Sequence, residues 1–182
     1  MMNIIKPDIE GLLIITPRVF EDERGAFYES FNSQQFNDVV GTEVNFVQDN
    51  QSVSQKGVLR GLHFQSPPFG QGKLVRVIKG SVIDIAVDIR KNSPTYGDYV
   101  AVELSADNKE QFWIPEGFAH GFVALEDETT FLYKCTNYYA PQYEGTLLWN
   151  DPMLNIDWGI SNPIISEKDA LGKEFSNFIS DY

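Results

Sequence analysis

Between positions 82 and 89, large aliphatic residues alternate with small or acidic residues. The aliphatic residues are Ile83, Ile85, Val87 and Ile89. A period of two is typical of a strand in a sheet with two unlike faces, so Asp84 should face away from the isoleucines. A second strand-like run occupies 73–79, and the pair Gly80-Ser81 between the runs suits a tight two-residue turn. We therefore expect a β-hairpin over 73–89.

Further strand-like segments follow, with turn-prone stretches between them. They lie at 99–104, 111–114, 120–125 and 130–139. Short strands at this spacing indicate a sandwich or a barrel. Helical patterns are confined to Ser33–Val40 and to a C-terminal tail at about 164–182, where Ser166 precedes Asp169 by three residues as in a capping box. We expect one all-β domain spanning residues 1–182, with a few short helices.

The charge of the chain narrows the choice of partners. The formal net charge is −12, which argues against nucleic acid, because binding to a phosphate backbone needs a basic surface. Half of the 14 basic residues nevertheless lie between positions 56 and 91. They are Lys56, Arg60, Lys73, Arg76, Lys79, Arg90 and Lys91. This segment could bind a small anion, or it could be a solvated strand surface.

Cysteine usage and hydropathy favour a cytoplasmic protein. Cys135 is the single cysteine, so one chain can form neither an intrachain disulfide nor a multi-thiolate metal site. Charged residues and a proline interrupt the first eleven residues before the apolar core of a signal peptide could form. No run of about 18 apolar residues occurs, so we expect no membrane span.

The two histidines, His63 and His120, are candidates for proton transfer because imidazole titrates near neutral pH. Each could instead be a hydrogen-bonded structural residue. The segment Pro115-x-Gly-x-x-His120 resembles the second motif of the cupin superfamily, in which this histidine often binds a metal. The first cupin motif, His-x-His, is replaced by His63-Phe-Gln65, with Lys73 downstream. A lysine beside two histidines would repel a cation, so we expect no metal.

A set of motifs in a fixed order carries a wider resemblance. They are Phe20-Glu-Asp-Glu-Arg24-Gly-Ala-Phe-Tyr-Glu29, Phe46-Val-Gln48-Asp-Asn50, Arg60-Gly-Leu-His63-Phe-Gln, Gln71-Gly-Lys73-Leu-Val-Arg76, Trp113-Ile-Pro-Glu-Gly-Phe-Ala-His120-Gly-Phe, Phe131-Leu-Tyr133-Lys and Leu148-Trp-Asn-Asp151-Pro. With them, about residues 1–160 closely resemble the dTDP-4-dehydrorhamnose 3,5-epimerase family. The resemblance implies a cupin-type β-sandwich or jelly-roll barrel, a homodimer, and chemistry without a cofactor.

The resemblance also implies a reaction. A dTDP-4-keto-6-deoxyhexose, dTDP-4-dehydro-6-deoxy-D-glucose, would be inverted at C3 and C5 to give dTDP-4-dehydro-L-rhamnose. His63 would remove a proton next to the C4 ketone, and Lys73 would stabilise the enolate oxygen that results. Tyr133 would return a proton on the opposite face. Asp169 would support His63, although it could equally serve only as a helix cap.

The resemblance assigns the remaining polar motif residues to substrate binding. They are Arg24, Glu29, Gln48, Asn50, Arg60, His120, Glu144 and Lys168. Guanidinium groups suit a diphosphate because their fork of donors matches phosphate oxygens. Taken singly, each of these residues would more often be a turn, cap or surface group.

Several alternatives stay open at the level of sequence. Asp84 is a second candidate for partnering a histidine, and Cys135 could be a nucleophile on the same strand face as Tyr133. The chain could be an epimerase of one carbon, a ketoisomerase, a non-catalytic nucleotide-sugar binding protein, or a metal-dependent cupin. The preferred nucleotide base, the final product of the pathway and the dimer contacts are not predicted.

Overall fold

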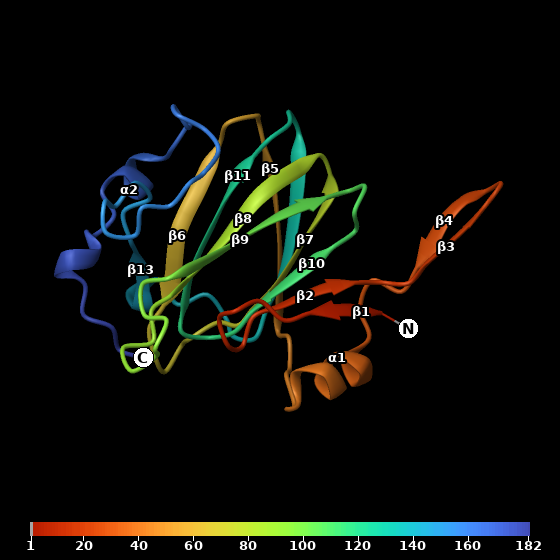
Figure 1. Cartoon of the computed structure of the whole chain (residues 1–182), viewed down its shortest axis with the longest axis horizontal. Coiled ribbons are helices and arrows are strands. Elements are labelled where there is room, and N and C mark those ends of the chain that lie inside the picture. The colour runs from red at the N-terminus through yellow and green to blue at the C-terminus, as the bar shows by residue number, and fades with distance from the viewer. Residues whose placement is uncertain (1) are drawn as a thin grey trace.

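Two antiparallel sheets face each other in the computed structural model, which describes residues 2–182 (Figure 1). The first sheet has six strands in the order β1 (Asn3–Ile5), β2 (Leu13–Thr16), β10 (Gln111–Ile114), β7 (Lys73–Lys79), β12 (Thr129–Cys135) and β5 (Gln48–Ser54). The second has five, in the order β13 (Glu144–Thr146), β6 (Leu59–Gln65), β11 (Phe118–Ala124), β8 (Ser81–Asp88) and β9 (Tyr99–Ser105). The expected all-β sandwich is confirmed.

Apolar side chains from both sheets fill the space between them. β7 contributes Val75 and Val77, and β12 contributes Phe131. From the second sheet come Ala86 and Phe122. The rings of Phe122 and Phe131 stack with centroids 4.2 Å apart, and burying one such side chain stabilises the fold by about 1.5–3 kcal/mol. The sheets are therefore held together by direct contact across this core.

The expected hairpin over 73–89 is wrong, although both of its strands form. β7 pairs with β10 and β12, whereas β8 pairs with β9 and β11, so the two strands lie in different sheets. Gly80, with a φ of +75°, lies where the chain passes between them. β8 is buried on both faces, with Ala86 towards the first sheet and Ile85 on the outer side. A strand with two apolar faces is more stable inside a covered sheet than in an exposed hairpin.

The C-terminal segment covers the outer face of the second sheet. Its contacting side chains are Leu147, Leu154, Trp158 and Phe175, which pack with Ile85 and Val87 of β8. This segment includes α2 (Glu167–Ala170) and two 3₁₀ turns, Pro141–Tyr143 and Phe175–Asn177. Figure 1 shows it wrapped beside β6 and β13. It therefore reaches the side of the sandwich where β13 and β6 lie.

The helix expected at Ser33–Val40 forms as α1 (Ser33–Val40) and covers part of the first sheet. The side chain of Asn32 accepts a hydrogen bond from the amide of Gln35 and caps the helix. The ring of Phe36 packs edge-on against that of Trp113, with the ring centroids 5.1 Å apart. Among residues 2–182, no helix is both long and apolar enough to cross a bilayer.

Most predicted strand limits hold within one or two residues, but the last strand is shorter than expected. β12 ends at Cys135, not at position 139. Cys135 lies opposite Lys73, where β7 begins, and opposite Gln48, where β5 begins. Beyond Cys135 neither neighbouring strand continues, and one further backbone bond, from the amide of Thr136 to the carbonyl oxygen of Gly72, ends the ladder.

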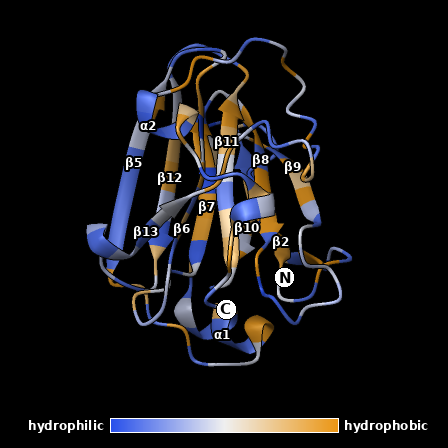
Figure 2. Cartoon of the chain, turned by 90° about the vertical axis from the view of Figure 1, so that its left-hand side faces the viewer, coloured by the Kyte–Doolittle hydropathy of each residue, from blue (hydrophilic) through white to orange (hydrophobic). Residues whose placement is uncertain are grey.

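A two-stranded arm, β3 (Val19–Asp22) and β4 (Gly25–Tyr28), extends away from the sandwich (Figure 1). Phe20 and Phe27 on this arm are 51% and 73% exposed. Figure 2 shows that β5, the edge strand of the first sheet, is mostly hydrophilic. Both the arm and this edge strand carry residues that are predicted to bind the substrate.

Candidate active site

A cavity of about 490 Å³ lies between the two sheets, and its walls come from five strands and from the segment 164–169. It gathers most of the residues predicted from the sequence. Those lining it are Arg60, His63, Lys73, His120, Tyr133, Lys168 and Asp169. His63 and Asp169 are 106 positions apart in the chain, so the fold assembles this group from distant segments.

His63 and Asp169 form a pair at the edge of the cavity. Nε2 of His63 lies 2.6 Å from Oδ1 of Asp169. The other carboxylate oxygen of Asp169 accepts a hydrogen bond from the backbone amide of Gly61. Ser166 is the N-cap of α2, and its side chain accepts a hydrogen bond from the backbone amide of Asp169. The helix cap at Ser166 and the pairing of Asp169 with His63 are therefore compatible. Burial alone would raise the pKa of Asp169, but the hydrogen bonds from His63, Gly61 and Ser166 outweigh it and lower the pKa.

A close approach of two glycines sets the position of His63. A Cβ on Gly61 would lie 2.6 Å from the Cα of Gly121, so β6 and β11 can approach this closely only without side chains there. In this register His63 lies directly opposite His120. The glycines beside each histidine in the sequence therefore bring the two imidazoles to one cavity.

Lys73 and Tyr133 come from the opposite sheet. Burial lowers the pKa of Lys73, and the nearby Cys135, Asp84 and Glu144 act against this shift. Burial raises the pKa of Tyr133, so its hydroxyl is protonated at neutral pH. The cavity thus has a lysine amine and a proton-carrying phenol on the wall opposite His63.

His120 has its own carboxylate partner. Both oxygens of Asp84 lie 3.0 Å from Nε2 of His120, and both side chains are buried. Burial raises the pKa of Asp84 and lowers that of His120, because a charge on either group would be poorly solvated. Asp84 therefore belongs to the second histidine, and Asp169 to the first.

A second compartment of about 240 Å³ adjoins the first and shares His63, Lys73 and Tyr133 with it. Its other lining side chains are mostly uncharged and polar, and they include Gln48, Asn50, Gln71 and Tyr139, with Glu144 as the charged exception. The carboxylate of Glu144 accepts a hydrogen bond from the hydroxyl of Tyr139 at 2.8 Å. It also forms an ion pair with the ammonium of Lys168 at 2.6 Å. Burial alone would raise the pKa of Glu144, but these two partners outweigh it and lower the pKa.

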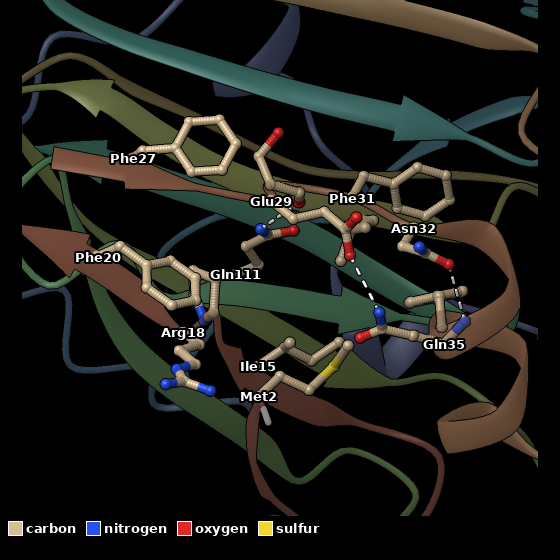
Figure 3. Close-up of a pocket in the computed structure, with 14 residues that line it drawn as sticks. Met2, Ile15, Arg18, Phe20, Phe27, Glu29, Phe31, Asn32, Gln35 and Gln111 are labelled. Atoms are coloured by element: carbon tan, nitrogen blue, oxygen red, sulfur yellow. Dashed lines mark hydrogen bonds between the residues drawn. The ribbon is translucent and has the colours of Figure 1, made fainter.

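Arg24 and Glu29 lie elsewhere in the chain's structure. Arg24 is at the tip of the arm, 85% exposed, and pairs with Asp22. Glu29 lines a separate cavity of about 370 Å³ under the root of the arm, where it accepts a hydrogen bond from Gln35 (Figure 3). Figure 3 shows Phe20 and Phe27 on one side of this cavity. The chain does not bring these two predicted binding residues to its own cavity.

Cys135 is buried beside the second compartment and lies 3.6 Å from the amide nitrogen of Asn50. Burial raises the pKa of the Cys135 thiol, which keeps it protonated and disfavours a nucleophilic role. Among residues 2–182, no three His, Cys, Asp or Glu side chains cluster as a metal site would require.

Tyr139 and Gln65 also line the second compartment, although the sequence motifs did not identify them as site residues. Gln65 follows His63 by two positions on β6, so the period of a strand would have placed it on the same face. Tyr139 lies in the loop after β12, and no local pattern indicates that this loop returns to the cavity.

The assembled groups suit proton transfer next to a carbonyl. A histidine held by a carboxylate can accept a proton, and a buried lysine can stabilise a negative oxygen. A protonated tyrosine on the facing wall can donate a proton.

Comparison with known proteins agrees with this chemistry. Residues 6–177 match a family model described as dTDP-4-dehydrorhamnose 3,5-epimerase. A Shigella flexneri protein of that name is 57% identical over 174 residues, covering 96% of each chain. A crystal structure of a Legionella pneumophila dTDP-6-deoxy-D-glucose-3,5-epimerase in complex with dTDP-4-keto-L-rhamnose has a TM-score of 0.94 at 52% identity, covering 98% of this chain and 95% of that one. A 3'-monoepimerase from Streptomyces bikiniensis in complex with dTDP-quinovose has a TM-score of 0.89 at 32% identity, covering 93% and 86%.

Proposed function

Because this chain belongs to the dTDP-4-dehydrorhamnose 3,5-epimerase family, we propose that it inverts C3 and C5 of dTDP-4-dehydro-6-deoxy-D-glucose to give dTDP-4-dehydro-L-rhamnose. The fold is the cupin-like β-sandwich of that family, and the chain is an isomerase. The main structural support for this proposal is the pair of His63 and Asp169 on one wall of a cavity whose other wall holds Lys73 and Tyr133.

In the proposed reaction His63 removes a proton from a carbon next to the C4 ketone. The electrons of the broken C–H bond move into an enolate, and the ammonium of Lys73 stabilises its oxygen. Asp169 fixes the orientation of the imidazole and stabilises its protonated form. The short contact between the two side chains supports these roles.

Inversion requires the proton to return on the other face of the hexose. His63 lies on β6 of one sheet and Tyr133 on β12 of the other, so the two groups reach the cavity from opposite walls. This placement supports Tyr133 as the donor. Neither step changes the oxidation state of the substrate overall, and none requires a cofactor.

Two observations favour inversion at both carbons over inversion at one. The chain is 57% identical to a relative named as a 3,5-epimerase, and 32% identical to a 3'-monoepimerase. The carbon atoms C3 and C5 flank the same ketone, so one base and one enolate-stabilising group serve both when the ring turns in the pocket.

The diphosphate would be bound by the positive groups at the cavity. Arg60 and Lys168 line it, and His120 supplies a further polar group. The amides of Gln48 and Asn50, together with Glu144, line the adjoining compartment and would bind uncharged parts of the substrate. The reaction needs no oxidising compartment, which fits a cytoplasmic enzyme with one buried free thiol.

We assign Arg24 and Glu29 to the site of a second copy in a homodimer. Arg24 lies at the tip of an arm that extends away from its own sandwich. The exposed rings of Phe20 and Phe27 give this arm an apolar surface that a partner would cover. A homodimer of this kind would add Arg24 to the positive groups that face the diphosphate.

Turnover of the dTDP-linked keto-sugar in deuterium oxide tests the proposal. NMR should show deuterium at both C3 and C5 of the product. In His63→Ala, kcat should fall by about 10³-fold or more, while the affinity for dTDP stays within about twofold. Deuterium at one carbon would indicate a single-centre epimerase. Binding without turnover in the parent protein would indicate a nucleotide-sugar binding protein.

A further inference from the structure

Gln65 is a buried amide beside the reacting groups that neither the resemblance nor the proposed reaction uses. It is 4% exposed, lies on β6 two residues after His63, and lines the second compartment with Lys73 and Tyr133. A buried amide at the wall of a cavity either binds a ligand or organises its surroundings.

The side-chain hydrogen bonds of Gln65 all go to the backbone of two loops. Its Nε2 donates to the carbonyl oxygens of Phe69 at 2.6 Å and Tyr138 at 3.2 Å. Its Oε1 accepts the amide of Ala140 at 2.8 Å. Both amide hydrogens are used, so Gln65 would have to release a loop before it could donate to a substrate.

Two of these bonds flank Tyr139 on either side. The Tyr139 amide also donates to Oε1 of Gln48 at 3.0 Å, and its hydroxyl donates to Glu144. Tyr139 is 54% exposed on a loop and would otherwise sample several positions. Gln65 therefore clamps the backbone that carries Tyr139 over the second compartment.

The backbone of Gln65 is itself anchored from behind. The hydroxyl of Tyr182 donates to its carbonyl oxygen, and the carbonyl of Tyr182 accepts the amide of Lys91. The backbone of Gln65 is thus linked through Tyr182 to the turn after β8, and this link does not involve the substrate.

We propose that Gln65 is a positioning residue that pre-forms the second compartment by holding Tyr139 and, through it, Gln48. It acts on binding of the uncharged, hydrogen-bonding part of the substrate and does not touch the reacting atoms. A pre-formed pocket binds more tightly because less freedom is lost when the ligand arrives. This inference rests on the proposed function for the identity of the substrate.

Gln65→Met tests the proposal because it keeps the shape of the side chain and removes all three hydrogen bonds. We expect KM for the keto-sugar, and Kd for unreactive dTDP-glucose, to rise about three- to tenfold. We expect kcat to stay within about twofold. Hydrogen exchange should accelerate in the peptide containing Ala140 and stay unchanged in strands of the first sheet.

Thr129→Val is the matched control. Thr129 is buried on β12, its hydroxyl donates to the carbonyl oxygen of Glu126, and its side chain lines neither compartment. Its loss should lower the melting temperature without changing KM. If Gln65→Met does not fold, Gln65→Asn is the second variant, because it keeps the amide but withdraws it by one methylene. We then expect KM to rise in the same direction, by a smaller factor.

Three outcomes would overturn the role of Gln65. They are an unchanged KM, a fall in kcat with KM constant, and exchange that accelerates throughout the chain as in a global loss of stability. Absence of turnover in the parent would refute the proposed function instead, and the titration with dTDP-glucose would still decide the role of Gln65.

Discussion

At the scale of single residues, the site depends on which carboxylate serves which histidine. Asp169 pairs with His63, and Asp84 pairs with His120. Each pair joins residues at least 36 positions apart. The two pairs differ in exposure, since the side chain of His63 is 30% exposed and that of His120 is 7% exposed. The more accessible imidazole, that of His63, is the one that we propose as the base.

Asp169→Asn should lower kcat/KM by about 10²-fold or more, because an amide cannot stabilise a protonated imidazole as a carboxylate does. The affinity for dTDP should stay within about twofold. Steady-state kinetics and a dTDP titration measure these quantities. Glu167→Gln is the control, because it removes an exposed carboxylate from the same first turn of α2. Equal effects of the two substitutions would contradict a role for Asp169 as the partner of His63.

Tyr133→Phe should separate proton removal from proton return. The phenol is protonated at neutral pH because burial raises its pKa, so the variant loses a donor and keeps its ring. Formation of inverted product should fall about 10²–10⁴-fold. Exchange of solvent deuterium into recovered substrate, followed by NMR, should continue because His63 is intact. Loss of both processes together would indicate that Tyr133 is needed for binding instead.

Part of this site could be predicted from short motifs. His63, Lys73 and Tyr133 each stand in a local pattern, and they do line one cavity. The assignment of Asp169 stayed open, because the capping-box pattern around Ser166 is a complete local explanation for that carboxylate. Only the packing of the C-terminal segment against β6 shows that its side chain also reaches His63.

At the scale of elements, the turn after β8 is organised around one buried carboxylate. Asp88 accepts hydrogen bonds from Arg90, Ser93 and Thr95. Burial alone would raise the pKa of Asp88, but these donors outweigh it and lower the pKa to about 2. This turn carries the chain from β8 to β9.

Asp88→Ala should lower the free energy of unfolding by about 2–3 kcal/mol, because it leaves buried donors without an acceptor. A carboxyl whose pKa is depressed in the folded state stabilises the protein above its unfolded pKa of about 3.9. That contribution should disappear as the pH falls from about 4 to about 2. Urea unfolding at pH 7 and at low pH measures it. A difference between parent and variant that persists at pH 2 would contradict this assignment.

The elements themselves were predictable where the pattern was local. The strand at 82–89 follows from its hydrophobic period, and the helix at Ser33–Val40 from its local helical pattern. The prediction that β7 pairs with β8 was wrong. A turn pair such as Gly80-Ser81 can join two strands of one hairpin, and it can equally join strands that lie in different sheets. The choice depends on the apolar segments that cover β8 from outside, and these lie more than 50 positions further along the chain.

At the scale of the whole molecule, the arm predicts a site shared between two chains. Arg24→Ala and His63→Ala should each be nearly inactive alone. Mixed in equal amounts and allowed to exchange, they should recover about a quarter of the parent activity. Half of the dimers are then mixed, and each mixed dimer holds one intact site.

The mixing experiment has a direct control. Combining Asp169→Asn with His63→Ala should restore nothing, because both residues lie in the same chain's pocket. If the Arg24 mixture also failed to recover while light scattering showed mixed dimers, the arm would act on its own chain. A strictly monomeric parent protein would remove the proposed homodimer altogether.

The separation of His63 and Asp169 along the chain also has a consequence during translation. The histidine emerges from the ribosome 106 residues before its carboxylate partner, so a nascent chain can build most of the sandwich without a competent base. Under the proposed roles, a nascent chain that has not yet reached position 169 lacks the carboxylate that supports His63. Fragments that stop before position 169 would carry His63 without this partner, and we expect them to lose at least as much activity as Asp169→Asn.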